Sequence, residues 1–106
     1  MQQIMIVGAG SVGGFFGVHL AKGNPNVSFL LRPRTLQAVK ERGLILRSAS
    51  GTLTVRPPAA SDPRELVRPD LIILAVKAYD LDEVMDQLEP VLTAKTIILT
   101  LQNGVD

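Results

Sequence analysis

Apolar residues gather into four short runs that are hydrophobic at consecutive rather than alternate positions. The runs are residues 3–7 (QIMIV), 27–31 (VSFLL), 70–76 (DLIILAV) and 96–101 (TIILTL). A strand covered on both faces of a sheet has such a continuous run, whereas a strand with one solvated face alternates. The four runs therefore predict four buried strands.

Other segments predict helices and one hairpin. Residues 11–22 carry apolar side chains at a spacing that suits a packed helix, which Pro25 prevents from continuing. Residues 35–42 and 80–88 predict two more helices, and the second has acids in its first turn, as the helix dipole favours. The strands at 44–48 and 52–56 flank a turn and predict a hairpin, and 57–63 (PPAASDP) predicts a loop.

Buried strands that alternate with helices predict an α/β fold with a mostly parallel sheet and helices on both faces. Ligands of such sheets bind beyond the carboxyl ends of the strands. Four groups of residues directly follow predicted strands and are therefore candidates for a site: 8–14, 32–34, 77–79 and 102–104.

The first group contains the pattern G-x-G-x-x-G between a strand and a helix, which is typical of a Rossmann-like dinucleotide site. Its residues are Gly8, Ala9, Gly10, Ser11, Val12 and Gly13. The first glycine allows a tight turn, the second lets a pyrophosphate approach the backbone, and the third lets the helix pack against the strand. The helix N-terminus then offers free N–H groups to the anion. The alternative is an ordinary glycine-rich turn.

The end of the second strand indicates which dinucleotide is bound. An NAD site usually has an acid there that holds the ribose 2′-hydroxyl, but no acid precedes Glu41 in this chain. Arg32 and Arg34 stand there instead, and an arginine can bind a 2′-phosphate through two hydrogen bonds. The sequence thus favours NADP over NAD, unless both arginines are solvated loop charges.

Lys77 and Asn103 follow the two later strands and are candidates for contacts with cofactor or substrate. Lysine suits a phosphate or a carboxylate, and asparagine both donates and accepts hydrogen bonds. A solvated lysine and a plain Asn-Gly turn are equally good interpretations. The single histidine, His19, lies within a predicted helix and away from this edge, which favours a surface or packing role.

Composition limits the class of protein. The chain has 106 residues, 46% hydrophobic and 20% charged, which suits one globular domain. A net charge of +1 argues for neither a nucleic-acid nor a membrane-surface partner, and we expect neither; the absence of cysteine excludes a disulfide or a Cys-ligated metal. The chain begins with no signal peptide and has no apolar run near the ~20 residues that span a bilayer. We expect a cytoplasmic protein without a metal.

Four segments together resemble the N-terminal domain of the 2-dehydropantoate 2-reductase (ketopantoate reductase) family. They are IMIVGAGSVGGFFG, FLLRPR, LIILAVKAYD and ILTLQNGVD, in this order, and the resemblance covers essentially the whole chain. The glycine motif is shared with many dehydrogenases, whereas VKAYD and LQNGV are more specific to this family.

The resemblance implies NADP(H) as cofactor and a role for each matching residue. Gly8 to Gly13 would bind the pyrophosphate and Arg32 the 2′-phosphate. Lys77 would contact the cofactor and shape the substrate pocket, and Asn103 would contact cofactor and substrate near the nicotinamide. The implied reaction is reduction of 2-dehydropantoate to pantoate by NADPH, a step toward pantothenate and coenzyme A.

The resemblance also implies that residues 1–106 are the NADP-binding part of a longer reductase. Family members are about three times as long, and their general-acid lysine and substrate-binding glutamate lie in a helical C-terminal domain that this sequence does not include. We therefore expect no catalytic residue in this chain, weak NADP binding, no reduction by the chain alone, and self-association through uncovered apolar surface.

Two other functions stay open. One is a nucleotide-sensing regulatory domain, although such domains usually keep an acid after the second strand. The other is an NADP-dependent reductase of a different 2-keto or 3-hydroxy acid, because related reductases share this N-terminal half.

Overall fold

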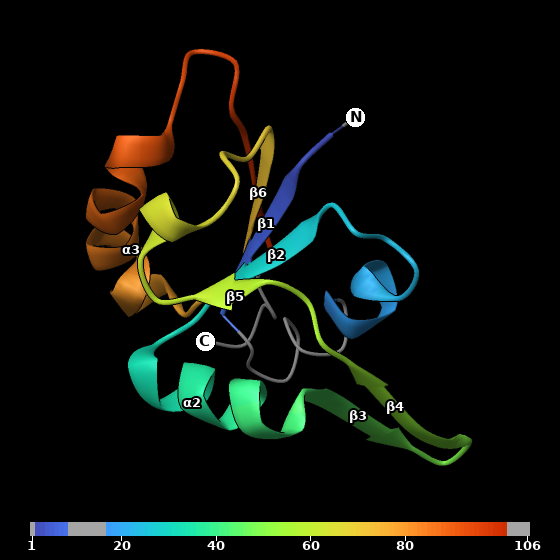
Figure 1. The fold of residues 1–106 in the computed structure, drawn as a ribbon. Coiled ribbons are helices and arrows are strands. Elements are labelled where there is room, and N and C mark those ends of the chain that lie inside the picture. The colour runs from blue at the N-terminus through green and yellow to red at the C-terminus, as the bar shows by residue number, and fades with distance from the viewer. Residues whose placement is uncertain (1, 9–16, 102–106) are drawn as a thin grey trace.

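A sheet of five parallel strands lies at the centre of the protein, in the order β5-β2-β1-β6-β7 (Figure 1). This computed structural model describes residues 2–8 and 17–101. The strands of the sheet are β1 (Ile4–Val7), β2 (Val27–Leu30), β5 (Ala59–Ala60), β6 (Leu71–Leu74) and β7 (Ile97–Thr100). Because all the pairings are parallel, the carboxyl ends of the strands lie along one edge.

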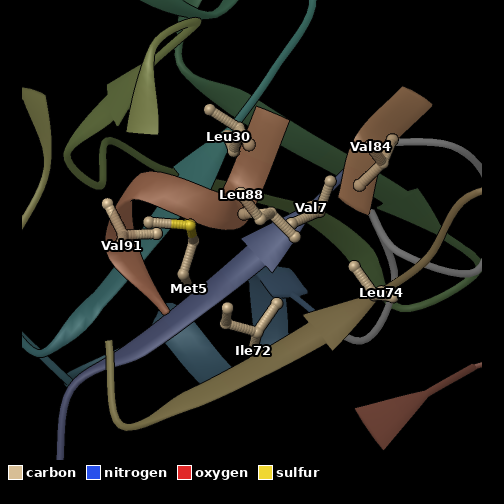
Figure 2. Packing of buried hydrophobic residues seen from close by; sticks show 8 residues of the cluster. All are labelled: Met5, Val7, Leu30, Ile72, Leu74, Val84, Leu88 and Val91. Carbon is tan, nitrogen blue, oxygen red and sulfur yellow. The ribbon is translucent and has the colours of Figure 1, made fainter. Parts of the chain in front are cut away.

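One face of the sheet packs against α3 (Leu81–Leu88) and the following 3₁₀ turn η3 (Glu89–Val91). Figure 2 shows the buried side chains of this interface, which come from β1, β2, β6, α3 and η3: Met5, Val7, Leu30, Ile72, Leu74, Val84, Leu88 and Val91. Leu88 and Met5 are fully buried. Helix α3 is thus fixed over the central strands by apolar burial.

The opposite face packs against the helical residues 17–21 and against α2 (Pro33–Arg42). Ile6, Phe29 and Ile73 project from the sheet into this second cluster, where Val18 and Val39 of the helices meet them. Both faces of the central strands are therefore buried. The predicted α/β, Rossmann-like architecture with helices on both faces is confirmed.

The predicted hairpin is also confirmed, as β3 (Leu44–Ser48) and β4 (Gly51–Val55). The two strands pair antiparallel, with Leu44 opposite Val55, and form a sheet of their own. In Figure 1 this hairpin projects away from the central sheet.

The loop expected at 57–63 is wrong in part, because it contains β5 and the start of the 3₁₀ turn η1 (Pro63–Glu65). β5 pairs with β2: the Phe29 N–H donates to the Pro58 carbonyl and the Leu31 N–H to the Ala60 carbonyl, both at 2.9 Å. Proline has no N–H but keeps its acceptor, so the segment can still border a strand.

The start of one helix and the burial of one strand also differ from the expectation. Helix α2 begins at Pro33 rather than Thr35, because proline is well suited to the first helical position. Strand β7 was expected to be buried, yet all four of its residues are exposed, with Ile97 59% and Leu99 46% accessible. It is the edge strand of the described sheet and pairs there with β6 alone.

Two predicted elements fall partly or wholly outside the described residues. Of the helix predicted at 11–22, the structure describes residues 17–22, and residues 17–21 are helical. The turn predicted at 102–106 lies outside the described residues. Over the parts of the chain that the structure describes, no helix has the length and apolar character needed to cross a bilayer.

Candidate functional site

The carboxyl ends of three neighbouring strands are level with one another at the candidate site. Val7 of β1 pairs with Leu30 of β2 on one side and with Leu74 of β6 on the other. The residues that follow these strands therefore emerge side by side. Gly8, Arg32 and Lys77 line one hollow of about 440 Å³ at this edge.

The structure thus brings together the three predicted site residues that it describes. The other predicted site residues lie outside the described part of the chain: Ala9, Gly10, Ser11, Val12, Gly13 and Asn103. His19 is an exposed helical residue and is not among those that line the hollows described here.

Gly8 has a backbone conformation and surroundings that exclude a side chain. Its φ angle is +100°, and a Cβ atom there would lie 2.9 Å from the carbonyl oxygen of Ala75. Its N–H donates to the Leu30 carbonyl at 3.0 Å, which continues the β1–β2 ladder. Directly after β1, the backbone at Gly8 is therefore not covered by a side chain of its own, so a ligand can approach it closely.

Arg32 sits where β2 passes into α2. Its backbone is extended (φ −66°, ψ 151°), and its carbonyl accepts the Leu36 N–H at 2.8 Å, so that it forms the N-cap of the helix. The first turn of α2 holds no acid, and Arg34 adds a second exposed cation there. Two cations at the positive end of a helix dipole favour an anionic partner over a cationic one.

Asp80 binds Arg32, and the sequence analysis missed it. Nη2 of Arg32 lies 3.2 Å from Oδ1 of Asp80, and the two side chains are 70% and 21% exposed. Asp80 ends the 3₁₀ turn η2 (Ala78–Asp80) and occupies the N-cap position of α3 without a side-chain capping hydrogen bond, and its N–H donates to the Lys77 carbonyl at 2.9 Å. The available signal is the last residue of VKAYD, which follows the strand at 70–76 rather than the second strand, where a dinucleotide site usually has its acid.

Lys77 follows β6 and is exposed at the rim of the 440 Å³ hollow. Among the described residues it has no ion pair, so its ammonium group is available to an anion. Tyr79 lines the same hollow with a 79% exposed ring.

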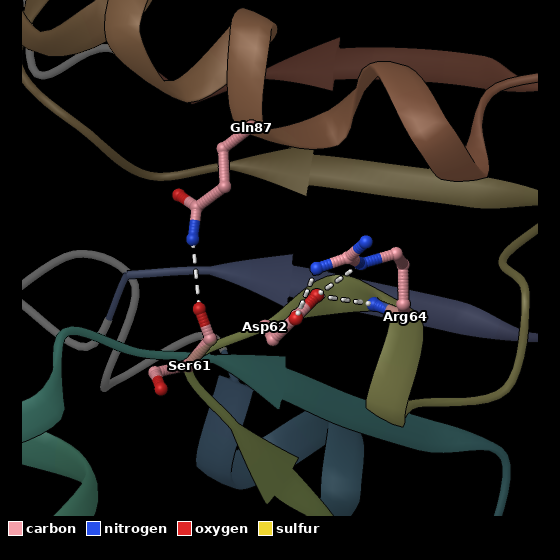
Figure 3. Close-up of polar contacts among 4 residues, drawn as sticks. All are labelled: Ser61, Asp62, Arg64 and Gln87. Atoms are coloured by element: carbon pink, nitrogen blue, oxygen red, sulfur yellow. Dashed lines mark hydrogen bonds and ion pairs between the residues drawn. The ribbon is translucent and has the colours of Figure 1, made fainter.

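A second hollow of about 460 Å³ adjoins the first and shares Gly8, Leu31, Arg32 and Val76 with it. Its walls are largely apolar, with polar groups from Ser61, Glu83 and Gln87. Gln87 of α3 donates through Nε2 to the Ser61 carbonyl at 2.7 Å and so joins the helix to the segment after β5 (Figure 3).

The segment beside Ser61 is held by a local ion pair. Asp62 accepts the backbone N–H of Arg64 at 3.0 Å and its guanidinium at 2.8 Å (Figure 3). The hydrogen bond from the Arg64 side chain, followed by that from its backbone, holds the pKa of Asp62 below its usual value.

The two hollows suit a ligand that has both a flat apolar part and anionic groups. The first offers a bare backbone and the cations Arg32 and Lys77, and the second offers apolar walls. This combination fits a dinucleotide at the carboxyl edge of a parallel sheet. No cluster of side chains within the described segments could hold a metal ion.

Comparison with known proteins decides the family. The family model described as "Ketopantoate reductase PanE/ApbA" matches residues 4–106. The chain belongs to this ketopantoate reductase family. A 2-dehydropantoate 2-reductase from Mesorhizobium japonicum is 36% identical over 104 residues, which are 97% of this chain and 32% of that protein.

Solved structures agree with the family assignment. The crystal structure of a PanE/ApbA family ketopantoate reductase from Ralstonia eutropha superposes with a TM-score of 0.85 at 35% identity, covering 97% of this chain and 35% of that one. D-mandelate dehydrogenase, solved with NADH and anilino(oxo)acetate, superposes with a TM-score of 0.82 at 29% identity, covering 98% of this chain and 34% of that one. The chain thus spans about a third of the length of these relatives.

Proposed function

We propose that this chain is the NADP(H)-binding domain of a 2-dehydropantoate 2-reductase. The observation that carries the proposal is the placement of Arg32 beside the bare backbone of Gly8, at the level edge of a parallel sheet, in a chain of the ketopantoate reductase family. An arginine at the end of the second strand is suited to a ribose 2′-phosphate.

The proposal gives each site residue a task. The turn from Gly8 to Gly13 would bind the pyrophosphate, Arg32 the 2′-phosphate, and Lys77 a cofactor or substrate oxygen. Asn103 would contact cofactor and substrate near the nicotinamide. The apolar hollow between β2 and α3 would take the adenine, because its walls are apolar and it shares Arg32 with the first hollow.

When bound, the reduced nicotinamide supplies a hydride to the carbonyl carbon of a 2-keto acid. This chain's own contribution is to bind and orient: Gly8 bares its backbone, Arg32 selects the cofactor, and Lys77 attracts an anionic group. We propose that the proton donor lies in a helical C-terminal domain of the longer protein, as the family resemblance implies. The isolated 106-residue chain would then bind the cofactor without reducing a substrate, and its cytoplasmic location remains a prediction.

A calorimetric titration of the chain with NADPH and with NADH tests the proposal. We expect tighter binding of NADPH, and Arg32→Ala should weaken NADPH binding by about 10- to 100-fold, since an arginine–phosphate pair is a charge-assisted contact. NADH binding should change much less. The matched control is Arg34→Ala, which removes an exposed cation two residues away that has no ion pair in the described structure.

Equal affinity for the two cofactors, or an equal effect of Arg32→Ala and Arg34→Ala, would contradict the role of Arg32. Reduction of 2-dehydropantoate by the purified 106-residue chain would contradict the proposal that the proton donor lies in a C-terminal domain.

One observation favours a second candidate, a reductase of another 2-keto acid. The likeness to D-mandelate dehydrogenase is nearly as strong as that to the ketopantoate reductases. Assays of the longer protein with 2-dehydropantoate and with benzoylformate would separate the two. A purely regulatory nucleotide sensor is disfavoured by membership of a reductase family.

A further inference from the structure

The guanidinium of Arg32 is already engaged by a carboxylate from another loop. Asp80 holds its Nη2 at 3.2 Å, at the rim of the hollow that Gly8 and Lys77 also line. The two residues come from the segments that follow β2 and β6, on either side of β1. An acid is therefore present beside the end of the second strand after all, although it is supplied from a distant part of the sequence.

We propose that Asp80 is a specificity-determining residue, which narrows the preference for NADPH over NADH by competing with the 2′-phosphate for Arg32. The proposal rests on the proposed function, because it takes Arg32 as the residue that faces the 2′ position of the adenosine ribose.

The two cofactors differ in charge at that position, and Asp80 responds to the difference. A 2′-phosphate brings negative charge, so it is repelled by the Asp80 carboxylate and must share the guanidinium with it. A free 2′-hydroxyl can donate a hydrogen bond, and a carboxylate can accept it. Asp80 therefore disfavours the phosphorylated ribose and is compatible with the unphosphorylated one.

The backbone of Asp80 is held in place beside the position of an incoming phosphate. Its N–H donates to the Lys77 carbonyl at 2.9 Å, and the residue occupies the N-cap position of α3. Its side chain is 21% exposed, whereas that of Arg32 is 70% exposed. Arg32 is the more exposed partner, and binding of a 2′-phosphate would draw its guanidinium away from the Asp80 carboxylate.

The Asp80→Asn variant tests the proposal, because it removes the charge and keeps the shape. We expect the ratio of NADH to NADPH dissociation constants, measured by calorimetry on the 106-residue chain, to rise by about 3- to 10-fold, as for one partly exposed charge. The gain should come mainly from tighter NADPH binding. Raising the salt concentration should reduce the difference between the variant and the original chain.

Two further variants make the result specific. Asp82→Asn removes the same charge two residues away, from an exposed side chain that has no ion pair in the described structure, and should change the ratio by less than about 2-fold. Asp80→Ser also removes the charge, and serine is well tolerated at a helix N-cap, so this variant should reproduce the effect of Asp80→Asn if Asp80→Asn folds poorly.

Three results would overturn the proposal: a ratio that stays constant, a ratio that falls because Asp80 instead holds Arg32 in place for the phosphate, or no NADPH binding by any variant. Arg32→Ala, measured in parallel, distinguishes failure of the role proposed for Asp80 from failure of the proposed phosphate site. If Arg32→Ala abolishes the NADPH preference but Asp80→Asn does not widen it, only the role of Asp80 fails. If Arg32→Ala has no effect, the proposed phosphate site fails and the role of Asp80 fails with it.

Discussion

Gly17 shows at the scale of one residue how closely a helix approaches the sheet. It is buried, and a Cβ atom there would lie 2.5 Å from Cζ of Phe29, a ring that is itself fully buried. The sequence analysis assigned close helix–strand packing to Gly13, which lies outside the described residues. Within them, Gly17 has this role.

We expect Gly17→Ala to lower the free energy of unfolding by about 1–3 kcal/mol, as overpacking of a core does. Helix propensity alone predicts the opposite, a gain of about 0.5–1 kcal/mol. Urea denaturation followed by circular dichroism distinguishes the two signs. Combining Gly17→Ala with Phe29→Leu should cost less than the sum of the single changes, and strict additivity would show that the two residues do not meet.

The Asp62–Arg64 pair makes a testable prediction about pH. The pKa of Asp62 is depressed in the folded chain, chiefly by the Arg64 side chain. The pair therefore stabilises the fold above the unfolded-state pKa of the carboxyl, and this contribution is lost as the pH falls through the lower folded-state pKa.

NMR titration of the Asp62 carboxyl should show its pKa rising in Arg64→Ala. It should stop short of the ordinary value, because the backbone N–H of residue 64 still donates to Asp62. An unchanged pKa would contradict the pairing.

At the scale of elements, α3 depends on its apolar face for its position over the sheet. Leu88 is fully buried in the cluster that α3 forms with β1 and β6, whereas Asp86 on the same helix is exposed. We expect Leu88→Ala to lower the free energy of unfolding by about 2–5 kcal/mol. Asp86→Ala should change it by at most about 0.5 kcal/mol. Equal effects in urea denaturation would show that α3 is not held by this contact.

The elements that sequence reasoning predicted are those with a strong local signal. The continuous apolar runs of β1, β2 and β6 identify buried strands, and the hairpin of β3 and β4 is marked by its turn. β5 has two alanines and no periodicity, so only its pairing with β2 makes it a strand. The exposure of β7 could not be read from its apolar run either, since it depends on which strand lies at the edge.

Sequence reasoning likewise predicted only part of the candidate site. Gly8, Arg32 and Lys77 were predicted because each directly follows a buried strand, and the carboxyl ends of parallel strands share one edge. Asp80 was not predicted, because its contact with Arg32 joins residues 48 positions apart. Such a contact follows from the order of strands in the sheet, which the sequence analysis did not specify.

At the scale of the whole molecule, β7 is a surface of the described structure that is prone to contacts with other chains. It combines exposed apolar side chains at Ile97, Ile98 and Leu99 with the open edge of the described sheet. Open strand edges and apolar patches both favour association. We expect the chain to self-associate with rising concentration.

Sedimentation velocity tests this prediction with the pair of changes Ile97→Thr and Leu99→Thr, which replace apolar side chains by threonine, a residue that strands favour. The double variant should sediment as a monomer at concentrations where the original chain does not. Val67→Thr is the control, because Val67 is 65% exposed but lies outside any strand. Suppression by the control alone, or by neither variant, would show that β7 is not the contact.

The central position of β1 has a consequence during synthesis. β1 is synthesised before both of its partners: it pairs with β2 on one side and with β6, which ends at residue 74, on the other. At about 5–20 residues per second, β6 is complete roughly 2–9 s after β2. For those seconds one side of the nascent β1 has no native partner. A chaperone that binds short apolar segments would therefore have β1 as a target until β6 has been synthesised.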